Sequence, residues 1–448
     1  MARLHALGIV LVLLWAGSGI ARAQRSAPLE LSLEEALTRV ARDNFQVRSA
    51  AADVAAAQAQ KRQARAAFLP RLTLSETQTS TTDPVNAFSF KLKQERFAQS
   101  DFSLGALNDP DRVDNFTTKI ELQQPIFNPD ALFQRRAAAE GARAAKQARN
   151  RTEAAVTFQV KRAYFGLVLA QRRAAVVDSA LATARANEDQ AKDVFEQGLI
   201  NRADLLAAQV RVLELEGQQS EARAGAQNAS DQLRYLLGIE EDVQITPTAG
   251  LQPERAVPVD TVDIARVNRE RSDMQALRFQ AEAARAQLRA QQTSFLPSLN
   301  VQGGYEWNDD QPFGTGGESW TAGVSLRWNV FSGFERIGAA QKARADLRRA
   351  ELALRDQSVQ NGVEIADALR RLETTRLQVR QAEAAVEQAR ESLRIRTDRF
   401  AQGLEKTTDL LNAETMLANQ RLAYLQRLYA HRMAQYRLEL LTERTLTP

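Results

Sequence analysis

The sequence predicts a mainly α-helical, elongated protein with a small β part, built as two tandem structural repeats. Three observations support this fold class. Nearly the same dozen residues occur twice, as FEQGLINRADLL from Phe195 and as FAQGLEKTTDLL from Phe400, 205 positions apart. Two long stretches carry apolar residues at alternating spacings of four and three, which is typical of coiled-coil helices. Four short stretches instead alternate apolar and polar residues with a period of two, which is typical of β-strands.

The N-terminus predicts a cleaved secretory signal peptide over residues 1–23. The stretch MARLHALGIVLVLLWAGSGIARAQ has a basic start, an apolar core and an ARA sequence that fits an A-x-A cleavage site. The alternative is a membrane anchor, but the apolar core is too short to span about 30 Å of hydrocarbon. The sequence contains no cysteine, so we expect no lipid on an N-terminal cysteine, no disulfide and no thiolate metal site.

The composition argues against an enzyme and against a nucleic-acid partner. His431 is the only histidine after the signal peptide, and no metal-ligand cluster or nucleophile–base arrangement accompanies it. The GTGG sequence has no lysine after it, so it does not match a phosphate-binding loop. The formal net charge is only +4, and charges of both signs alternate along the helical stretches. We therefore expect no catalytic residue, no cofactor and no nucleic acid.

Each long apolar series predicts a helix that pairs with a return helix. The first series steps by four and three from Val156 to Phe195, and the second from Ile365 through Arg396 to Phe400. After the second copy of the repeated dozen, a similar spacing resumes at Leu411. Gly198 and Gly403 lie where the long helices should end, because glycine accepts the left-handed conformation that closes a helix. Each repeated dozen is therefore the predicted tip of an antiparallel helical hairpin.

Each repeat also contains one predicted β-hairpin. In SWTAGVSLRWNVF and FTTKIELQQP, apolar and polar residues alternate, and the preceding strands begin with LPRLTL and LPSLNV. The strands are about ten residues long with an apolar face and aromatic ends, which is typical of transmembrane β-barrel strands. The alternative is a small sheet packed on the helices. Four strands cannot close a barrel, so a barrel requires several chains. The insert at 79–115 predicts an exposed loop with a short amphipathic helix, with a receptor or plug role as a possible use.

These patterns divide the chain into four parts: a signal peptide (1–23), a first repeat (24–238), an irregular or mixed segment (239–261) and a second repeat (262–448). Each repeat is predicted to contain a helix, a β-hairpin, a long helix and a return helix. In the first repeat the last three elements occupy about 69–125, 130–197 and 203–237. In the second they occupy about 296–331, 334–402 and 407–441.

The order and duplication of these elements resemble the TolC-like outer-membrane efflux proteins, from about Leu29 to Leu441. The resemblance implies a homotrimer in which three chains of four strands form one 12-stranded barrel in outer-membrane lipid. It implies that the helices form a hollow periplasmic tunnel. It also implies a duct for drugs, other toxic small molecules or secreted proteins, working with a periplasmic adaptor and an inner-membrane pump or ABC translocase of tripartite export or type I secretion.

The resemblance also assigns roles to the hairpin tips. It implies that the tips narrow the periplasmic entrance and that Gly198, Leu199, Gly403 and Leu404 contact the adaptor. The family's second tip carries an aromatic residue, a glycine, a basic residue and two acidic residues one helical turn apart.

In this sequence Phe400, Gly403 and Asp409 match that tip pattern, whereas Glu405 replaces the basic residue and Asn412 replaces the second acid. Asp204 is the matching acid of the first tip. A ring of three Asp409 carboxylates would attract cations. The alternative is that Asp204 and Asp409 stabilise helix starts through the helix dipole.

Two functions from different classes remain open at this point. The first is a passive outer-membrane exit duct. The second is a periplasmic coiled-coil adaptor or scaffold without a membrane-spanning barrel, which would share the signal peptide and the long hairpins. The four strands with an apolar face and aromatic ends favour the duct, because an adaptor has no need of them.

Overall fold

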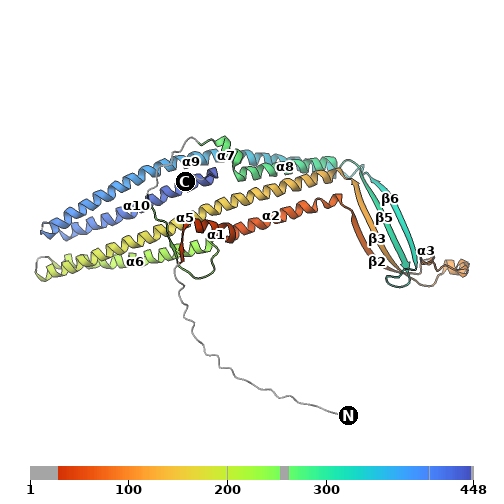
Figure 1. The fold of residues 1–448 in the computed structure, drawn as a ribbon, viewed down its shortest axis with the longest axis horizontal. Helices are drawn as coiled ribbons and strands as arrows, with labels where there is room; N and C mark the ends of the chain where they lie inside the picture. The colour runs from red at the N-terminus through yellow and green to blue at the C-terminus, as the bar shows by residue number, and fades with distance from the viewer. Residues whose placement is uncertain (1–28, 199, 253–261, 403, 445–448) are drawn as a thin grey trace, which may run out of the picture.

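The computed structural model describes residues 29–198, 200–252, 262–402 and 404–444. The predicted signal peptide therefore lies outside the described residues, as do Leu199 and Gly403. The mainly helical fold with a small β part is confirmed. The molecule is elongated: a four-stranded sheet lies at one end, the strand end, and the turns of two long helical hairpins lie at the other, the tip end (Figure 1).

Two very long helices extend from the strand end to the tip end. They are α5 (Pro129–Glu196) and α9 (Glu335–Ala401), of 68 and 67 residues. At 1.5 Å per residue each is about 100 Å long. The return helices are α6 (Arg202–Leu236) and α10 (Thr407–Thr442), and the shorter helices are α1 (Leu33–Asp43), α2 (Phe45–Gln63), α7 (Ile264–Glu270) and α8 (Ser272–Thr293). No helix of the described ranges is long and apolar enough to cross a membrane.

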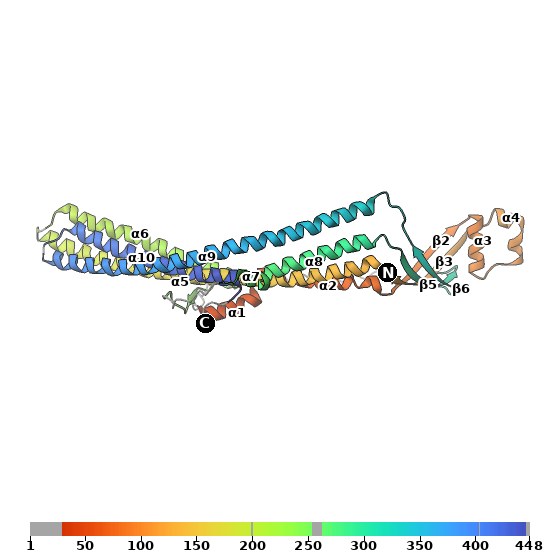
Figure 2. The same cartoon turned by 90° about the horizontal axis from the view of Figure 1, so that it is seen from above.

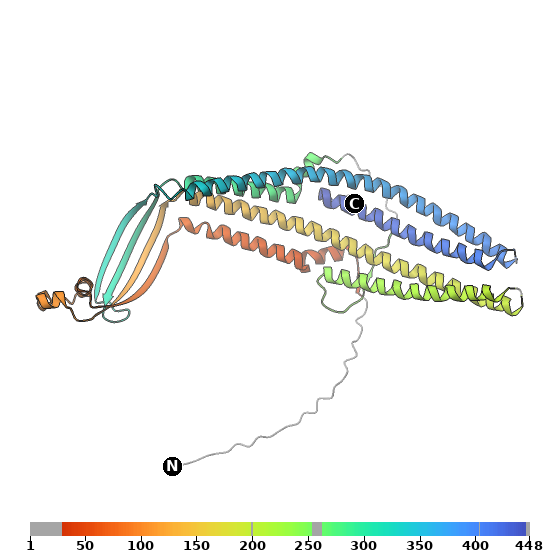
Figure 3. The same cartoon turned by 180° about the vertical axis from the view of Figure 1, so that it is seen from behind.

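The helices form one layer, four helices wide along its length. Near the strand end α2 packs on α5, α5 on α8, and α8 on α9. Near the tip end α6 packs on α5, α5 on α10, and α10 on α9. Figure 3 shows that α6 is followed in space by α2, and α10 by α8, so that each pair acts as one interrupted helix beside a continuous one.

The two interruptions correct the prediction of one continuous helix before each β-hairpin. Asn44 separates α1 from α2 and has extended backbone angles, while its side-chain oxygen accepts hydrogen bonds from the backbone N–H groups of Gln46 and Val47. Arg271 separates α7 from α8 in the same extended conformation. Asparagine is a strong helix-starting residue. The apolar spacing continues across both breaks, and it therefore conceals them.

The sheet has the order β2-β3-β5-β6, with antiparallel neighbours throughout. Its strands are β2 (Arg71–Thr81), β3 (Val113–Phe127), β5 (Ser298–Asp309) and β6 (Gly317–Arg327). β6 ends earlier than the alternation predicts, so Trp328 and Val330 lie beyond it. Each strand connects to a helix of the layer. Seen from above, the sheet lies beyond the ends of the helices (Figure 2), and it is inclined to their axes (Figure 1).

The register gives the sheet one apolar and one polar face. Leu72, Ile120 and Val324 belong to the apolar set, which is extensively exposed. Apart from Val113 and Pro125 near the two ends of β3, the opposite parity carries small or polar residues: 71, 73, 75, 77 and 79 on β2; 115, 117, 119, 121 and 123 on β3; 298, 300, 302, 304, 306 and 308 on β5; and 317, 319, 321, 323, 325 and 327 on β6. Successive residues of a strand point to opposite faces, so this separation is a property of the whole sheet.

A small core lies where the two halves of the layer meet. The parallel pair β1 (Leu29–Leu31) and β4 (Ile245–Pro247) lies beside α5. The buried hydroxyl of Tyr164 donates to the carbonyl oxygen of Leu31 at 2.9 Å and accepts from the N–H of Ala249 at 3.1 Å. The segment between the repeats is thereby attached to the long helix. Of that predicted segment, 253–261 lies outside the described residues.

Candidate functional site at the hairpin tips

The first tip is a short turn between α5 and α6. Gly198 has φ +72°, which confirms the predicted left-handed conformation, and its N–H donates to the carbonyl of Phe195 at 2.8 Å. Asn201 then starts α6, because its side-chain oxygen accepts a hydrogen bond from the N–H of Asp204 at 3.0 Å. Asp204 is therefore in the first turn of α6, where a negative charge interacts favourably with the helix dipole.

The second tip lies between α9 and α10. Phe400 is half-buried in the last turn of α9, and Leu404 is exposed in the turn. α10 starts after Lys406 without a side-chain hydrogen bond, and Asp409 lies in its first turn. Asp409 is half-buried, whereas Asn412 is exposed one turn further along. The asparagine therefore presents a neutral amide where the family's second acid would place a charge.

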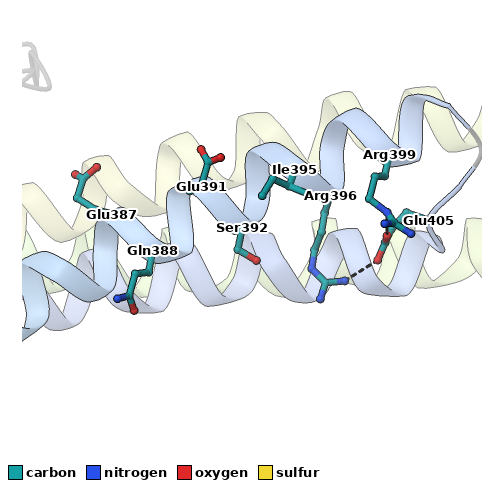
Figure 4. A pocket seen from close by; sticks show the side chains of 8 residues that line it. All are labelled: Glu387, Gln388, Glu391, Ser392, Ile395, Arg396, Arg399 and Glu405. Carbon is teal, nitrogen blue, oxygen red and sulfur yellow. Dashed lines mark hydrogen bonds and ion pairs between the residues drawn. The ribbon is translucent and has the colours of Figure 1, made fainter.

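Glu405 forms two ion pairs within the second tip. Its carboxylate lies 2.6 Å from Nη1 of Arg396 and 2.9 Å from Nε of Arg399, and its side chain is only 11% exposed. Figure 4 shows both arginines reaching from the last turns of α9 toward Glu405. The acid that replaces the family's basic residue is thus neutralised by bases of its own tip. The coiled-coil spacing in the sequence assigned Arg396 to the series that faces the partner helix, so this cluster was not identified.

An open groove of about 790 Å³ follows the same face of α9 toward the tip. Its lining is Glu387, Gln388, Glu391, Ser392, Ile395, Arg396, Arg399 and Glu405 (Figure 4). Apart from Glu405 in the turn, these positions recur at spacings of three to four along α9, with one large apolar side chain, Ile395, which is 45% exposed. Such a mixed face is suited to a reversible contact with another helix.

A crevice of about 270 Å³ separates the two hairpins further from the tips. Asn187 of α5 donates its side-chain amide to Glu414 of α10 across it. Burial raises the pKa of Glu414, because desolvation disfavours the charged carboxylate. Both hairpins are therefore linked by a polar contact that sequence reasoning missed. Glu414 is one of many polar residues of α10, so no signal in the sequence indicated this contact.

The site contains no recognisable metal centre. Within the described ranges, no three histidine, cysteine or acidic side chains gather in a way that could hold a metal ion. The assigned tip residues instead combine turn formers, one half-buried acid on each return helix and a neutralised Glu405.

Comparison with known proteins gives a consistent result. Residues 36–239 and 264–443 match the family described as outer membrane efflux protein. The alkaline protease secretion protein AprF of Pseudomonas aeruginosa is 24% identical over 370 residues, covering 79% of this chain and 72% of AprF. The outer membrane protein TolC of Vibrio cholerae is 23% identical over 334 residues, covering 70% of this chain and 75% of TolC. The crystal structure of the Campylobacter jejuni CmeC outer membrane channel superposes with a TM-score of 0.79 at 18% identity, covering 92% of this chain and 85% of CmeC.

The family match and these relatives identify an outer-membrane exit duct with a long periplasmic extension. The match covers most of the chain, and the chain belongs to the outer membrane efflux protein family. Members of this family are channels and not enzymes, and they work with adaptors and inner-membrane pumps in tripartite efflux and type I secretion. Family membership therefore decides for the duct and against the adaptor or scaffold that the sequence left open.

Proposed function

We propose that three copies of this chain form one duct by sharing a 12-stranded barrel. Strands β2 and β6 are the edges of the sheet, and each has a neighbour on one side only. An unpaired edge cannot face lipid, whereas β6 of one chain can pair with β2 of the next until the sheet closes. The observation that carries this proposal is the separation of the apolar face from the polar one. In a closed barrel the apolar face meets lipid and the polar face lines the lumen.

The helical layer continues this barrel as a tunnel. Every strand of the sheet leads into one of the four helices near the strand end, so closing the sheet brings the helical layers of three chains side by side. Six hairpin tips then surround the periplasmic entrance. Asp409, Asn412, Glu405, Phe400 and Asp204 would border it, with Asp409 from three chains forming one acidic ring.

The tip turns also offer the contact surface for a periplasmic adaptor. Leu404 is exposed beside the open groove of α9, and Gly198 turns the first tip without a side chain. With Leu199 and Gly403, which lie outside the described residues, they form the proposed contact. The adaptor would connect the duct to an inner-membrane pump or ABC translocase. The cargo class is small toxic molecules or secreted proteins, and the relative AprF is named for secretion of an alkaline protease.

The mass of the particle extracted by detergent from outer membranes tests this assembly. We expect three chains per particle, measured by native mass spectrometry, and expect the particle to form ion-conducting pores in a lipid bilayer. A monomeric particle without conductance would contradict the shared barrel, because one open sheet cannot remain in lipid.

A further inference from the structure

The insert between β2 and β3 is a folded unit that the duct function leaves unexplained. It contains α3 (Pro84–Lys93), the 3₁₀ turn Gln99–Phe102 and α4 (Leu104–Asn108), and it is thus more ordered than the predicted loop with one short helix. Phe97 packs edge-on against Phe88 and Phe102, with ring centroids 4.7 and 5.0 Å apart. Lys91 forms an ion pair with Asp101 at 2.9 Å. The equivalent connection between β5 and β6 has only seven residues, 310–316.

The insert is attached to the second β-hairpin of its own chain. Nζ of Lys93 lies 2.9 Å from Oε1 of Glu306 on β5, and Arg96 pairs with Asp310 just after that strand. At Gly317 the insert approaches so closely that an added Cβ would lie 1.8 Å from the carbonyl oxygen of Lys93. Only glycine fits such a contact. The insert therefore reaches from the first hairpin across to the second.

All of these sheet contacts lie on the polar face. The buried side chain of Gln94 donates to Oδ1 of Asn115 at 2.9 Å, and Asn115 donates to Oδ1 of Asn308 at 3.0 Å. In the register, 115, 306, 308 and 317 share the parity of the polar positions 119, 302 and 321. A buried network whose donors have partners fixes the position of the segment that carries it. The insert is thus held over the polar face and not beside it.

The connection between β5 and β6 lies on the apolar side of the sheet. The N–H of Phe313, between β5 and β6, donates to Oε1 of Glu76 at 3.1 Å. Glu76 has the parity of Leu72 and Leu74, which belong to the apolar face. Of the two connections at this end of the sheet, the insert is therefore the one on the polar side. In a closed barrel the polar side is the lumen.

We propose that the insert is an outer constriction, which narrows the extracellular mouth of the duct and limits the size of solutes that enter the lumen from outside. The inference rests on the trimeric barrel proposed above, in which three inserts would surround one opening. Its exposed apolar side chains include Leu104 of α4, at 78% exposure, and the neighbouring Phe102, at 60%. They offer apolar surface where inserts of neighbouring chains approach one another.

Thiol labelling from outside the cell tests the constriction, because the chain has no cysteine and any introduced one is unique. Ser325→Cys places a thiol on the polar face of β6 at the far end from the insert. Maleimide–polyethylene glycol reagents of increasing size are added to intact cells. We expect the parent duct to admit only the smallest reagents. Replacing 82–112 by Asn-Gly, a two-residue turn suited to joining Thr81 to Val113, should extend labelling to larger ones.

A charge exchange provides the second variant, in which the insert is retained but its contact with β5 is weakened. Lys93→Glu puts two negative charges where the anchoring pair was, and we expect labelling of Ser325→Cys by intermediate reagents to rise several-fold. Adding Glu306→Lys should restore the parent rate. Arg112→Glu is the matched control, because among the described residues the ion pair of Arg112 is with Asp114, two positions further along the same hairpin.

The outcomes distinguish failure of the proposed constriction from failure of the proposed barrel. Equal labelling by every reagent in the parent, the shortened chain and the Lys93→Glu variant would overturn the constriction. Failure of the barrel gives a different result, in which even the smallest reagent does not distinguish Ser325→Cys from Val324→Cys on the opposite face. Gln311→Cys, exposed between β5 and β6, reports that each reagent reaches the cell surface.

Discussion

At the scale of single residues, Glu405 shows how a substitution is absorbed locally. A glutamate where the family pattern has a base should leave an unpaired acid in the turn. Arg396 and Arg399, one turn apart on α9, instead hold its carboxylate. The sequence contained this information, because both arginines precede Glu405 within nine residues. The coiled-coil spacing assigned Arg396 to the series that faces the partner helix, however. Spacing alone does not show that a long side chain reaches toward the turn.

Asp409 is the residue for which the two interpretations of the tip differ most. We expect Asp409→Ala to lower the cation selectivity of the reconstituted pore, because in the proposed trimer it removes one charge from each of three chains at the entrance. Reversal potentials in a salt gradient measure this selectivity. The matched variant is Asp204→Ala, in the first turn of the other return helix.

An unchanged reversal potential for Asp409→Ala would show that Asp409 does not border the pore. A role limited to the helix start would then remain, with a loss of about 0.3–1 kcal/mol in the stability of α10.

At the scale of elements, the two helix interruptions carry equivalent contacts. Nδ2 of Asn44 donates to the carbonyl of Leu236 at the end of α6, at 2.8 Å. Nη1 of Arg271 donates to the carbonyl of Leu441 near the end of α10, at 3.3 Å. Each interruption therefore satisfies a helix-terminal carbonyl and joins a return helix to the helix beyond it. Sequence patterns predicted the helices but not their breaks, because the breaks depend on these distant partners.

We expect Arg271→Ala to be more destabilising than Asn44→Ala. Arg271 is 2% exposed and bonds Asp273 through two nitrogens at 2.8 and 2.7 Å, so its removal leaves a partly buried acid without its main partner. The expected cost is about 3 kcal/mol, against about 1–2 kcal/mol for the neutral cap at Asn44. Thermal unfolding of the detergent-solubilised protein, followed by circular dichroism, measures both. Equal losses would contradict a special contribution from the charged contact.

The burial of His431 predicts that the stability of the hairpin formed by α9 and α10 depends on pH. Its Nδ1 lies 3.0 Å from Oγ1 of Thr375, and burial, followed by the charges of Arg432 and Arg376, lowers the pKa of His431 below its usual 6.5. The folded state therefore disfavours the protonated ring. Its contribution to stability is complete above pH 6.5 and is lost as the pH falls through the folded-state pKa.

We expect His431→Gln to reduce the loss of melting temperature between about pH 7.5 and pH 5. Many carboxylates also titrate toward the lower limit, so the difference between parent and variant is the quantity to measure. Identical pH profiles would show that His431 does not contribute to this dependence.

At the scale of the whole molecule, the sequence predicted the architecture because its signals were long and repeated. The 205-residue shift, the coiled-coil spacing and the two β-hairpins are properties of many residues at once, and tertiary contacts do not change them. The position of the insert on the polar face was not predictable. It depends on Lys93, Gln94 and Gly317, whose partners are settled only when the two hairpins lie side by side.

The assignment of the two faces has a direct test. Leu72→Arg places a charge on the apolar face of β2 at the second residue of the strand, and we expect a cost of about 1 kcal/mol per chain, because the cost of a lipid-facing arginine falls from the middle of the bilayer toward its edge. The neighbouring Thr73→Arg points to the polar face and should be tolerated. The yield of trimer in the outer-membrane fraction measures the difference. Similar yields for both variants would contradict lipid contact at Leu72.

The constant offset between the repeats indicates how the chain originated. Phe195 and Phe400 are separated by 205 positions, and so are Leu236 and Leu441, the carbonyls bound at the two interruptions. Such conservation of length is what a gene duplication followed by fusion leaves behind. In the proposed trimer, an ancestor with a single repeat would have needed six copies to enclose the same tube. Fusion allowed one β-hairpin to acquire an insert while the other stayed short, so that in this trimer the six tips are nearly equivalent but only three inserts surround the strand end.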